Sequence, residues 1–183
     1  ASRSVAQRRA ASRSVALRRL ASRCVALRRA ASRNVVIIGG EAAVSADVAA
    51  TLTSVGFTVN RVQGADRYAT ANAAAAQTKV SAGGNIGSFA GKRTAFLTSG
   101  IGFADAVSAS GWAFENKHPI FLTDGTTLSA ETAAAMVAAG VQQVIILGGT
   151  AVVSDGVKAS VEAVSGVINS LRIGGADRYE TAT

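Results

Sequence analysis

The chain has 183 residues, of which 49% are hydrophobic and 16% charged, so it is long enough to bury one ordinary core. Its formal net charge of +8 is unevenly distributed: residues 1–33 hold ten Arg and no acidic residue, whereas residues 34–183 hold nine basic and eleven acidic residues. The globular part is therefore nearly neutral, which excludes a strongly basic nucleic-acid-binding domain. A single cysteine, Cys24, excludes an internal disulfide. No apolar run approaches the roughly 18 residues that span a membrane.

Residues 1–30 are three copies of a decapeptide, ASRSVAQRRA, ASRSVALRRL and ASRCVALRRA. A ten-residue period at about 100° per residue winds the apolar positions around a helix, so we expect disorder or an irregular helix over residues 1–33. One interpretation is a basic arm for nucleic acid, an anionic polymer or a membrane surface, and another is a transit peptide. We favour a low-complexity expansion or an out-of-frame translation, because the segment shares nothing with the repeats that follow.

From residue 34 onward, short β-branched runs alternate with Ala-rich stretches of helical length. This alternation predicts right-handed β-α-β crossovers and a mainly parallel sheet with helices on both faces. The nearly continuous apolar runs VVII and VIIL agree, because parallel strands are buried on both sides. The predicted strands span residues 35–38, 58–62, 94–98, 120–123, 144–147 and 168–173, and the predicted helices span residues 45–55, 66–79, 104–116, 130–139 and 155–164.

The helix ends are marked by their usual residues. A residue that can cap exposed N–H groups precedes each of several helices, and glycines follow others. The capping residues are Ser45, Ser129, Ser154, Asp66 and Asp177, and the terminating glycines are Gly56, Gly140 and Gly166.

Two sequence blocks occur twice. VVIIGGEAAVS, residues 35–45, returns as VIILGGTAVVS, residues 144–154, and RVQGADRYATA, residues 61–71, returns as RIGGADRYETA, residues 172–182. The chain is therefore predicted to be a tandem repeat. We divide residues 34–183 into a partial module, 34–80, and a main module, 81–183. Because the chain starts without Met and stops inside a repeated motif, we expect both ends to be fragment boundaries.

This order of motifs, with FADA at residues 103–106 and PIFLTD at residues 119–124, resembles the cell wall-binding repeat 2 family. Modules of that family occur in surface proteins of Clostridia and Actinobacteria, usually three in tandem. The resemblance implies Rossmann-like or Toprim-like α/β modules that anchor a secreted, S-layer-associated protein to the wall of a Gram-positive bacterium. The implied partner is an anionic, teichoic-acid-like cell-wall glycopolymer. The implied assembly is a three-module ring, for which this chain needs further modules. No enzymatic activity, cofactor, metal or nucleic-acid partner is predicted.

Three motifs supply candidate polymer contacts. In GADRY, the arginines are expected to donate bidentate hydrogen bonds to phosphate or carboxylate groups. The structural alternative is that its Asp caps a helix, its Arg pairs with a carboxylate and its Tyr packs between repeats. The Asp of FADA either binds sugar hydroxyls or fixes its loop. PIFL matches the PILL segment that the family places near the polymer, with one substitution. The candidates are Arg61, Asp66, Arg67, Tyr68, Asp105, Pro119, Ile120, Phe121, Leu122, Arg172, Asp177, Arg178 and Tyr179.

The alternative function is a nucleotide-binding Rossmann-type enzyme. Helix starts after Gly-Gly turns suit phosphate groups. However, SGIGFAD keeps only the first two glycines of GxGxxG, and Asp105 stands where the third is required. The acidic residue expected after the next strand is matched only by Asp124. No GxSxG motif is present. His118, the one histidine, is predicted to be a loop residue, and Trp112 is predicted to pack in a helix core.

Overall fold

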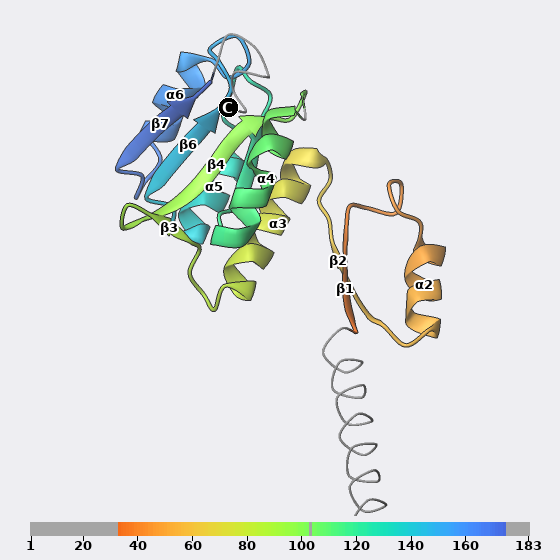
Figure 1. Cartoon of the computed structure of the whole chain (residues 1–183). Coiled ribbons are helices and arrows are strands. Elements are labelled where there is room, and N and C mark those ends of the chain that lie inside the picture. Colours follow the sequence, from red (N-terminus) through yellow and green to blue (C-terminus); the bar gives the residue numbers. More distant parts are fainter. Residues whose placement is uncertain (1–32, 103, 175–183) are drawn as a thin grey trace, which may run out of the picture. The chain divides into compact units, whose positions relative to one another are not determined.

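A computed structural model describes residues 33–102 and 104–174. Residues 1–32 of the Arg-rich segment, Phe103 and the second GADRY copy lie outside the described residues. Strands and helices alternate along the described chain, as the sequence predicts (Figure 1). The strands are β1 (Asn34–Ile38), β2 (Thr58–Val62), β3 (Ser88–Phe89), β4 (Lys92–Ser99), β5 (Ile120–Thr123), β6 (Gln143–Leu147) and β7 (Asn169–Ile173); the helices are α2 (Ala46–Ser54), α3 (Arg67–Ser81), α4 (Ala104–Asn116), α5 (Ala130–Ala139) and α6 (Asp155–Glu162).

The chain divides into two compact units, and the smaller one is built on β1, α2 and β2. Strands β1 and β2 pair with each other in a two-stranded sheet. Helix α2 contributes no buried residue, and Val36 and Ile38 of β1 are 45% and 61% exposed. The smaller unit has the same element order and the same repeated sequence block as β6, α6 and β7 of the larger unit.

The larger unit contains a five-stranded mixed sheet. Strand β4 pairs in parallel with β5 and with β6, and β6 pairs in parallel with β7. Strand β3 pairs antiparallel with β4, which the sequence did not predict. It has only two residues, and its turn places Ala90 and Gly91 at φ 50° and 75°. The α/β class is confirmed, while this short hairpin makes the sheet mixed.

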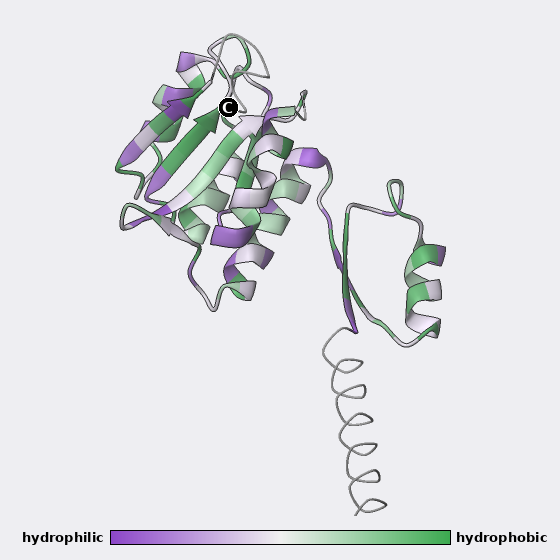
Figure 2. Cartoon of the chain, viewed as in Figure 1, coloured by the Kyte–Doolittle hydropathy of each residue, from purple (hydrophilic) through white to green (hydrophobic). Residues whose placement is uncertain are grey.

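The core lies on both faces of the sheet. One cluster joins β4, β5 and β6 to α3, α5 and α6, and includes Leu97, Phe121 and Ile146. The other joins Phe96 and residues of β6 to α4. Strand β6 is buried along its whole length, and Figure 2 shows it as an apolar strand. Burial on both sides explains the uninterrupted apolar run in its sequence.

The predicted caps form at three helix starts. The side chain of Asp66 accepts the N–H of Ala69 at 2.8 Å, and Ser129 accepts that of Thr132 at 3.1 Å. Ser154 does the same for the third residue after it. Gly140 follows α5 in the left-handed conformation at φ 76°. Each contact satisfies backbone groups that lack a partner inside the helix.

His118 lies in the connection before β5, as predicted, but its side chain is buried, with 3% exposed. Its ring stacks at a tilt on Trp112, with centroids 4.8 Å apart, and Nδ1 lies 3.0 Å from the carbonyl oxygen of Thr94. Burial lowers the pKa of His118, because the charged imidazolium loses its hydration. Trp112 itself remains 40% exposed and packs edge-on against Phe89 and Phe96.

The buried imidazole predicts that stability falls in mild acid. Folding lowers the pKa of His118 below its unfolded-state value of about 6.5. The stability that the neutral ring contributes is therefore complete above a pH of about 6.5. It is lost as the pH falls through that value toward the folded-state pKa. The slope of the free energy of unfolding against pH is at most about 1.4 kcal/mol per pH unit for one proton. Urea unfolding between pH 5.5 and 8 measures it. His118→Gln should remove the slope, and an unchanged slope in this variant would contradict the assignment, since the chain has one histidine.

Candidate functional site

A pocket of about 290 Å³ opens at the carboxyl end of β5, beside the start of α3. The carboxyl ends of parallel strands are the usual ligand side of an α/β sheet. The pocket brings together the first GADRY copy, the end of PIFLTD and the start of α5. Its lining residues are Ala65, Asp66, Tyr68, Ala69, Asn72, Leu122, Thr123, Asp124, Thr127, Ser129 and Glu131.

The start of α3 is fastened to the end of β4. Arg67 donates from Nη1 to the carbonyl oxygen of Gly100 at 2.7 Å. The ring of Tyr68 packs against the same glycine, where a Cβ atom would lie only 2.7 Å from Cε1. Any larger residue than glycine would therefore push Tyr68 out of place. The GADRY residues are held by this contact and by the Asp66 cap, without a carboxylate partner for Arg67 among the described residues.

The loop after β5 is organised by Asp124. Its Oδ1 accepts the backbone N–H groups of Thr126 at 2.8 Å and Thr127 at 2.7 Å, and its Oδ2 accepts the Thr127 hydroxyl at 2.8 Å. These bonds, led by those from Thr127, lower the pKa of Asp124 to about 2. The carboxylate at this rim of the pocket is therefore charged throughout the neutral and mildly acidic range.

The PIFL residues divide between the core and the pocket. Pro119 is buried, Phe121 is fully buried, and Ile120 packs against the cluster beneath α4. Leu122 alone of the four lines the pocket. Successive residues of β5 face opposite sides of the sheet, both of which are buried, and the last residues of the strand reach the carboxyl edge where the pocket lies.

Asp105 stands in the first turn of α4 and faces the Gly-Gly turn after β6. Its Oδ2 lies 2.8 Å from the position that a Cβ atom on Gly148 would occupy. A negative charge at this turn opposes binding of a phosphate there. This geometry therefore weakens the nucleotide-binding alternative, which needs an anion site at such a turn.

Arg61 and Arg172 make the same contact in the two copies of the repeat. Arg172 donates from Nη1 to the carbonyl oxygens of Gly148 at 2.9 Å and Val153 at 2.7 Å. Its Nη2 lies 3.1 Å from Oδ1 of Asp155. Arg61 donates to the carbonyl oxygen of Gly39, the counterpart of Gly148, at 2.8 Å. Both guanidinium groups thus brace a Gly-Gly turn against the following strand.

The remaining candidates, Asp177, Arg178 and Tyr179, lie outside the described residues. Across residues 33–102 and 104–174, no cluster of three His, Cys, Asp or Glu side chains is placed to hold a metal ion. None of the helices in that part of the chain is long and apolar enough to cross a membrane.

Several pocket residues were missed by sequence reasoning. Asn72 lies one helical turn after Tyr68, so it faces the same side of α3. Thr127, Ser129 and Glu131 follow β5, and the rule that ligands bind at the carboxyl edge of a sheet would have pointed to them. Glu131 lies in the first turn of α5.

The fold and pocket define a small α/β binding module. The family model for cell wall binding domain 2 (CWB2) matches residues 61–158, more than half of the chain. The chain belongs to this family of cell-wall-binding modules, which places it at the wall or surface of a Gram-positive bacterium.

Similar proteins agree with this assignment. N-acetylmuramoyl-L-alanine amidase LytC of Bacillus subtilis (strain 168) is 29% identical over 149 residues, which are 81% of this chain and 27% of that protein. Cwp8 from Clostridium difficile is 29% identical with a TM-score of 0.65, covering 81% of this chain and 23% of that one. Cwp6 from the same organism is 24% identical with a TM-score of 0.71, covering 82% and 23%, and this likeness concerns the fold. The chain spans about a quarter of the length of each relative.

The contacts of Arg172 predict a structural effect of its removal. Arg172→Ala should lower the free energy of unfolding by about 2–4 kcal/mol, because carbonyl groups and Asp155 lose charge-assisted hydrogen bonds. Urea denaturation measures the change. Wall binding of the folded fraction should be unaltered. Full stability combined with lost wall binding would instead make Arg172 a polymer contact.

Proposed function

We propose that this chain is a non-catalytic anchoring module that holds a secreted, S-layer-associated protein on an anionic, teichoic-acid-like secondary polymer of the cell wall. The observation that supports this role is the pocket, in which the GADRY motif and the end of PIFLTD meet at the ligand edge of the sheet. The hydroxyl groups of Thr123, Thr127 and Ser129 in its lining are engaged in structural bonds, which suits binding better than catalysis. Thr123 donates to the Thr127 carbonyl, and Ser129 donates to Thr132.

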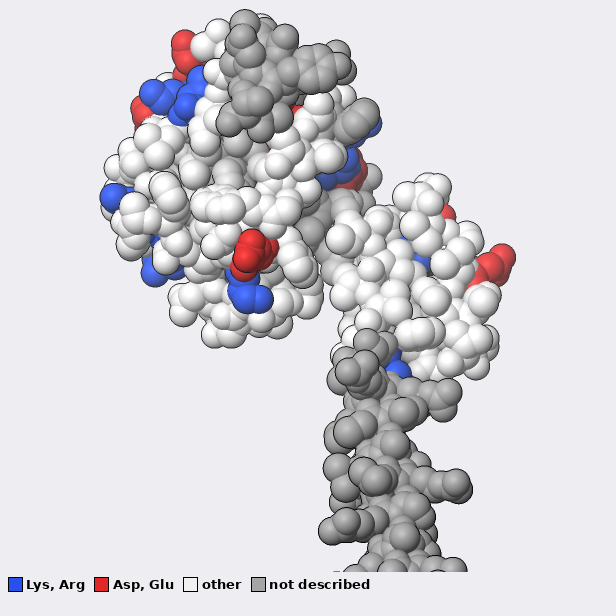
Figure 3. Space-filling model, in the orientation of Figure 1, with Lys and Arg blue, Asp and Glu red and all other residues white. Residues whose placement is uncertain are grey.

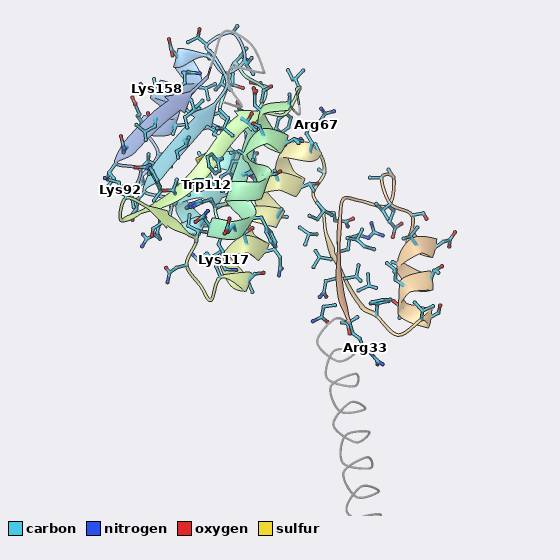
Figure 4. The ribbon with its side chains drawn as sticks, in the orientation of Figure 1. Arg33, Arg67, Lys92, Trp112, Lys117 and Lys158 are labelled. Atoms are coloured by element: carbon cyan, nitrogen blue, oxygen red, sulfur yellow. The ribbon has the colours of Figure 1, made fainter. Side chains whose placement is uncertain are left out.

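Arg67 is the proposed contact to the negative groups of the polymer. It is exposed, lies between the pocket residues Asp66 and Tyr68 in sequence, and is fixed in place through Gly100. Figure 4 shows it at the α3 end of the larger unit. On the visible face of that unit, Figure 3 shows basic side chains as separate positions among acidic ones, without one continuous basic patch in the part drawn in colour. Recognition is therefore proposed to depend on a local Arg contact and not on a broad charged surface.

Asp66, Tyr68 and Leu122 are proposed to contact the sugar rings, since they line the pocket. An aromatic ring beside polar groups offers both a packing surface and hydrogen bonds to a sugar. The other candidates are proposed to support the site without contacting the polymer. Pro119, Ile120 and Phe121 are proposed to support the strand that ends at the pocket, and Asp105 faces the Gly-Gly turn after β6. Arg61 and Arg172 each brace the Gly-Gly turn of their own copy of the repeat.

Sedimentation with purified Gram-positive cell walls tests the proposal. The chain should pellet with intact walls and stay in solution after acid extraction of the secondary polymer. Arg67→Ala should weaken binding roughly tenfold, because a charge-assisted hydrogen bond contributes about 1.5–3 kcal/mol. Lys117→Asn, which removes an exposed charge before β5 and away from the pocket, is the matched control and should bind normally (Figure 4). Undiminished binding to extracted walls would refute polymer anchoring.

We also propose that modules of this type associate with further repeats into a three-module ring. Strand β1 supports this, because its residues Val36 and Ile38 are exposed whereas their counterparts Ile145 and Leu147, in the repeated block, are buried under α4. The apolar face of β1 therefore has the character of a surface that another module covers.

Sedimentation velocity tests this association. The chain should form species larger than a monomer at tens of micromolar, and Ile38→Asp should reduce them because it places a charge on the exposed apolar face. Val55→Asp, at an exposed position beyond α2, is the control and should leave association unchanged. A strictly monomeric chain across this range would contradict association through β1.

A further inference from the structure

The charge of the pocket is opposite to what an anionic ligand needs. Its lining includes three carboxylates, those of Asp66, Asp124 and Glu131, and no Lys or Arg among the described residues. A phosphate or carboxylate group of the polymer would be repelled from this space. The negative groups of the polymer must therefore bind outside the pocket, and a different part of the polymer must enter it.

The hydrogen bonds within the pocket also favour a ligand that is rich in donors. Three of the four hydroxyl donors at the pocket are already used: Thr123 donates to the Thr127 carbonyl at 2.5 Å, Thr127 donates to Asp124 at 2.8 Å, and Ser129 donates to Thr132 at 3.1 Å. The fourth is the hydroxyl of Tyr68. The amide of Asn72 donates to the Thr132 hydroxyl at 3.3 Å. What the pocket offers to a ligand is thus mainly acceptor capacity, which calls for a ligand rich in donors.

The free acceptors belong to specific atoms. Oδ1 of Asp66 takes the N–H of Ala69, which leaves Oδ2 for a ligand. Glu131 stands exposed in the first turn of α5, and the structure gives its carboxylate no salt bridge within the described residues. Because no three-residue metal-ligand cluster exists among the described side chains, an organic cation suits these separated carboxylates better than a metal ion.

We propose that the pocket binds an ammonium-bearing unit of the wall polymer, either an amino sugar or an aminoacyl ester. This inference rests on the proposed function and names the chemical group that the same site recognises. The ammonium group donates to Asp66 and Glu131, while the ring or ester portion packs against Tyr68 and Leu122. Arg67, outside the pocket, contacts a neighbouring negative group of the polymer. The module therefore binds a polymer that carries both ammonium groups and negatively charged groups.

NMR titration of the isotope-labelled full chain tests the assignment. Glucosamine and D-alanine methyl ester are the ammonium probes, and N-acetylglucosamine and glucose are their neutral counterparts. At least one ammonium probe should shift the amide signals of Ala69, Asn72 and Thr127, and the neutral sugars should bind at least tenfold more weakly. Equal binding of N-acetylglucosamine, or no shift at these amides with either ammonium probe, would overturn the proposal.

A matched pair of variants localises the effect. Glu131→Gln should weaken binding of the ammonium probe about threefold to tenfold, because it removes one pocket charge while keeping the shape of the side chain. Glu115→Gln removes an equal charge from the exposed surface of α4 and should leave the affinity unchanged. Equal losses in the two variants would show a general charge effect and overturn the assignment to the pocket.

Wall preparations separate this inference from the proposed function. N-acetylation of walls with acetic anhydride neutralises their amines and should reduce sedimentation of the chain, as acid extraction of the polymer does. If extraction abolishes binding but acetylation leaves it unchanged, the ammonium assignment fails and polymer anchoring stands. If extraction leaves binding unchanged, polymer anchoring fails. Mild alkaline hydrolysis, which removes aminoacyl esters and spares amino sugars, then identifies the source of the ammonium group.

Discussion

The parallel pairing of β4 with β6 is the interaction on which the rest of the larger unit depends. Each strand is buried on both faces: Leu97 and Ile146 beneath α3, α5 and α6, and Phe96 and Ile145 beneath α4. Because parallel strands end at a common edge, this pairing sets the loops after β4, β5 and β6 side by side. The Gly100 contact, the pocket and the braced Gly-Gly turn all lie at that edge.

The described arginines of the repeated motif make two kinds of contact. Arg61 and Arg172 direct their donors inward to carbonyl oxygens of a tight turn, where a planar guanidinium satisfies several acceptors at once. Arg67 uses one nitrogen to reach Gly100 and remains exposed. Residues of one type in one short motif therefore differ in their contacts according to the backbone groups that surround them.

The acidic pocket and the exposed Arg67 make the site electrostatically mixed. A uniformly basic groove would attract any polyanion and would discriminate poorly among wall polymers. A pocket whose carboxylates reject negative groups adds selectivity, because a polymer without a matching donor is disfavoured. The fixed charge of Asp124, held by bonds from Thr126 and Thr127, keeps this rejection in place in mild acid.

The sequence by itself determined the α/β class, the element order with most boundaries, the tandem repeat and the helix caps, because these follow from local periodicity and from residues such as Asp66 and Ser154. Its motifs also singled out Asp66, Tyr68 and Leu122, which line the candidate pocket. Only the tertiary structure decided that β3 joins the sheet, that His118 is buried and that Asn72 and Glu131 complete the pocket. The tertiary structure also decided that Arg172 donates to the carbonyl oxygen of Gly148 within the fold. The reason is physical, because these outcomes depend on which strands become neighbours. Thr94 of β4 pairs with Gln143 of β6, 49 positions later in the chain, and no local sequence pattern records such a pairing.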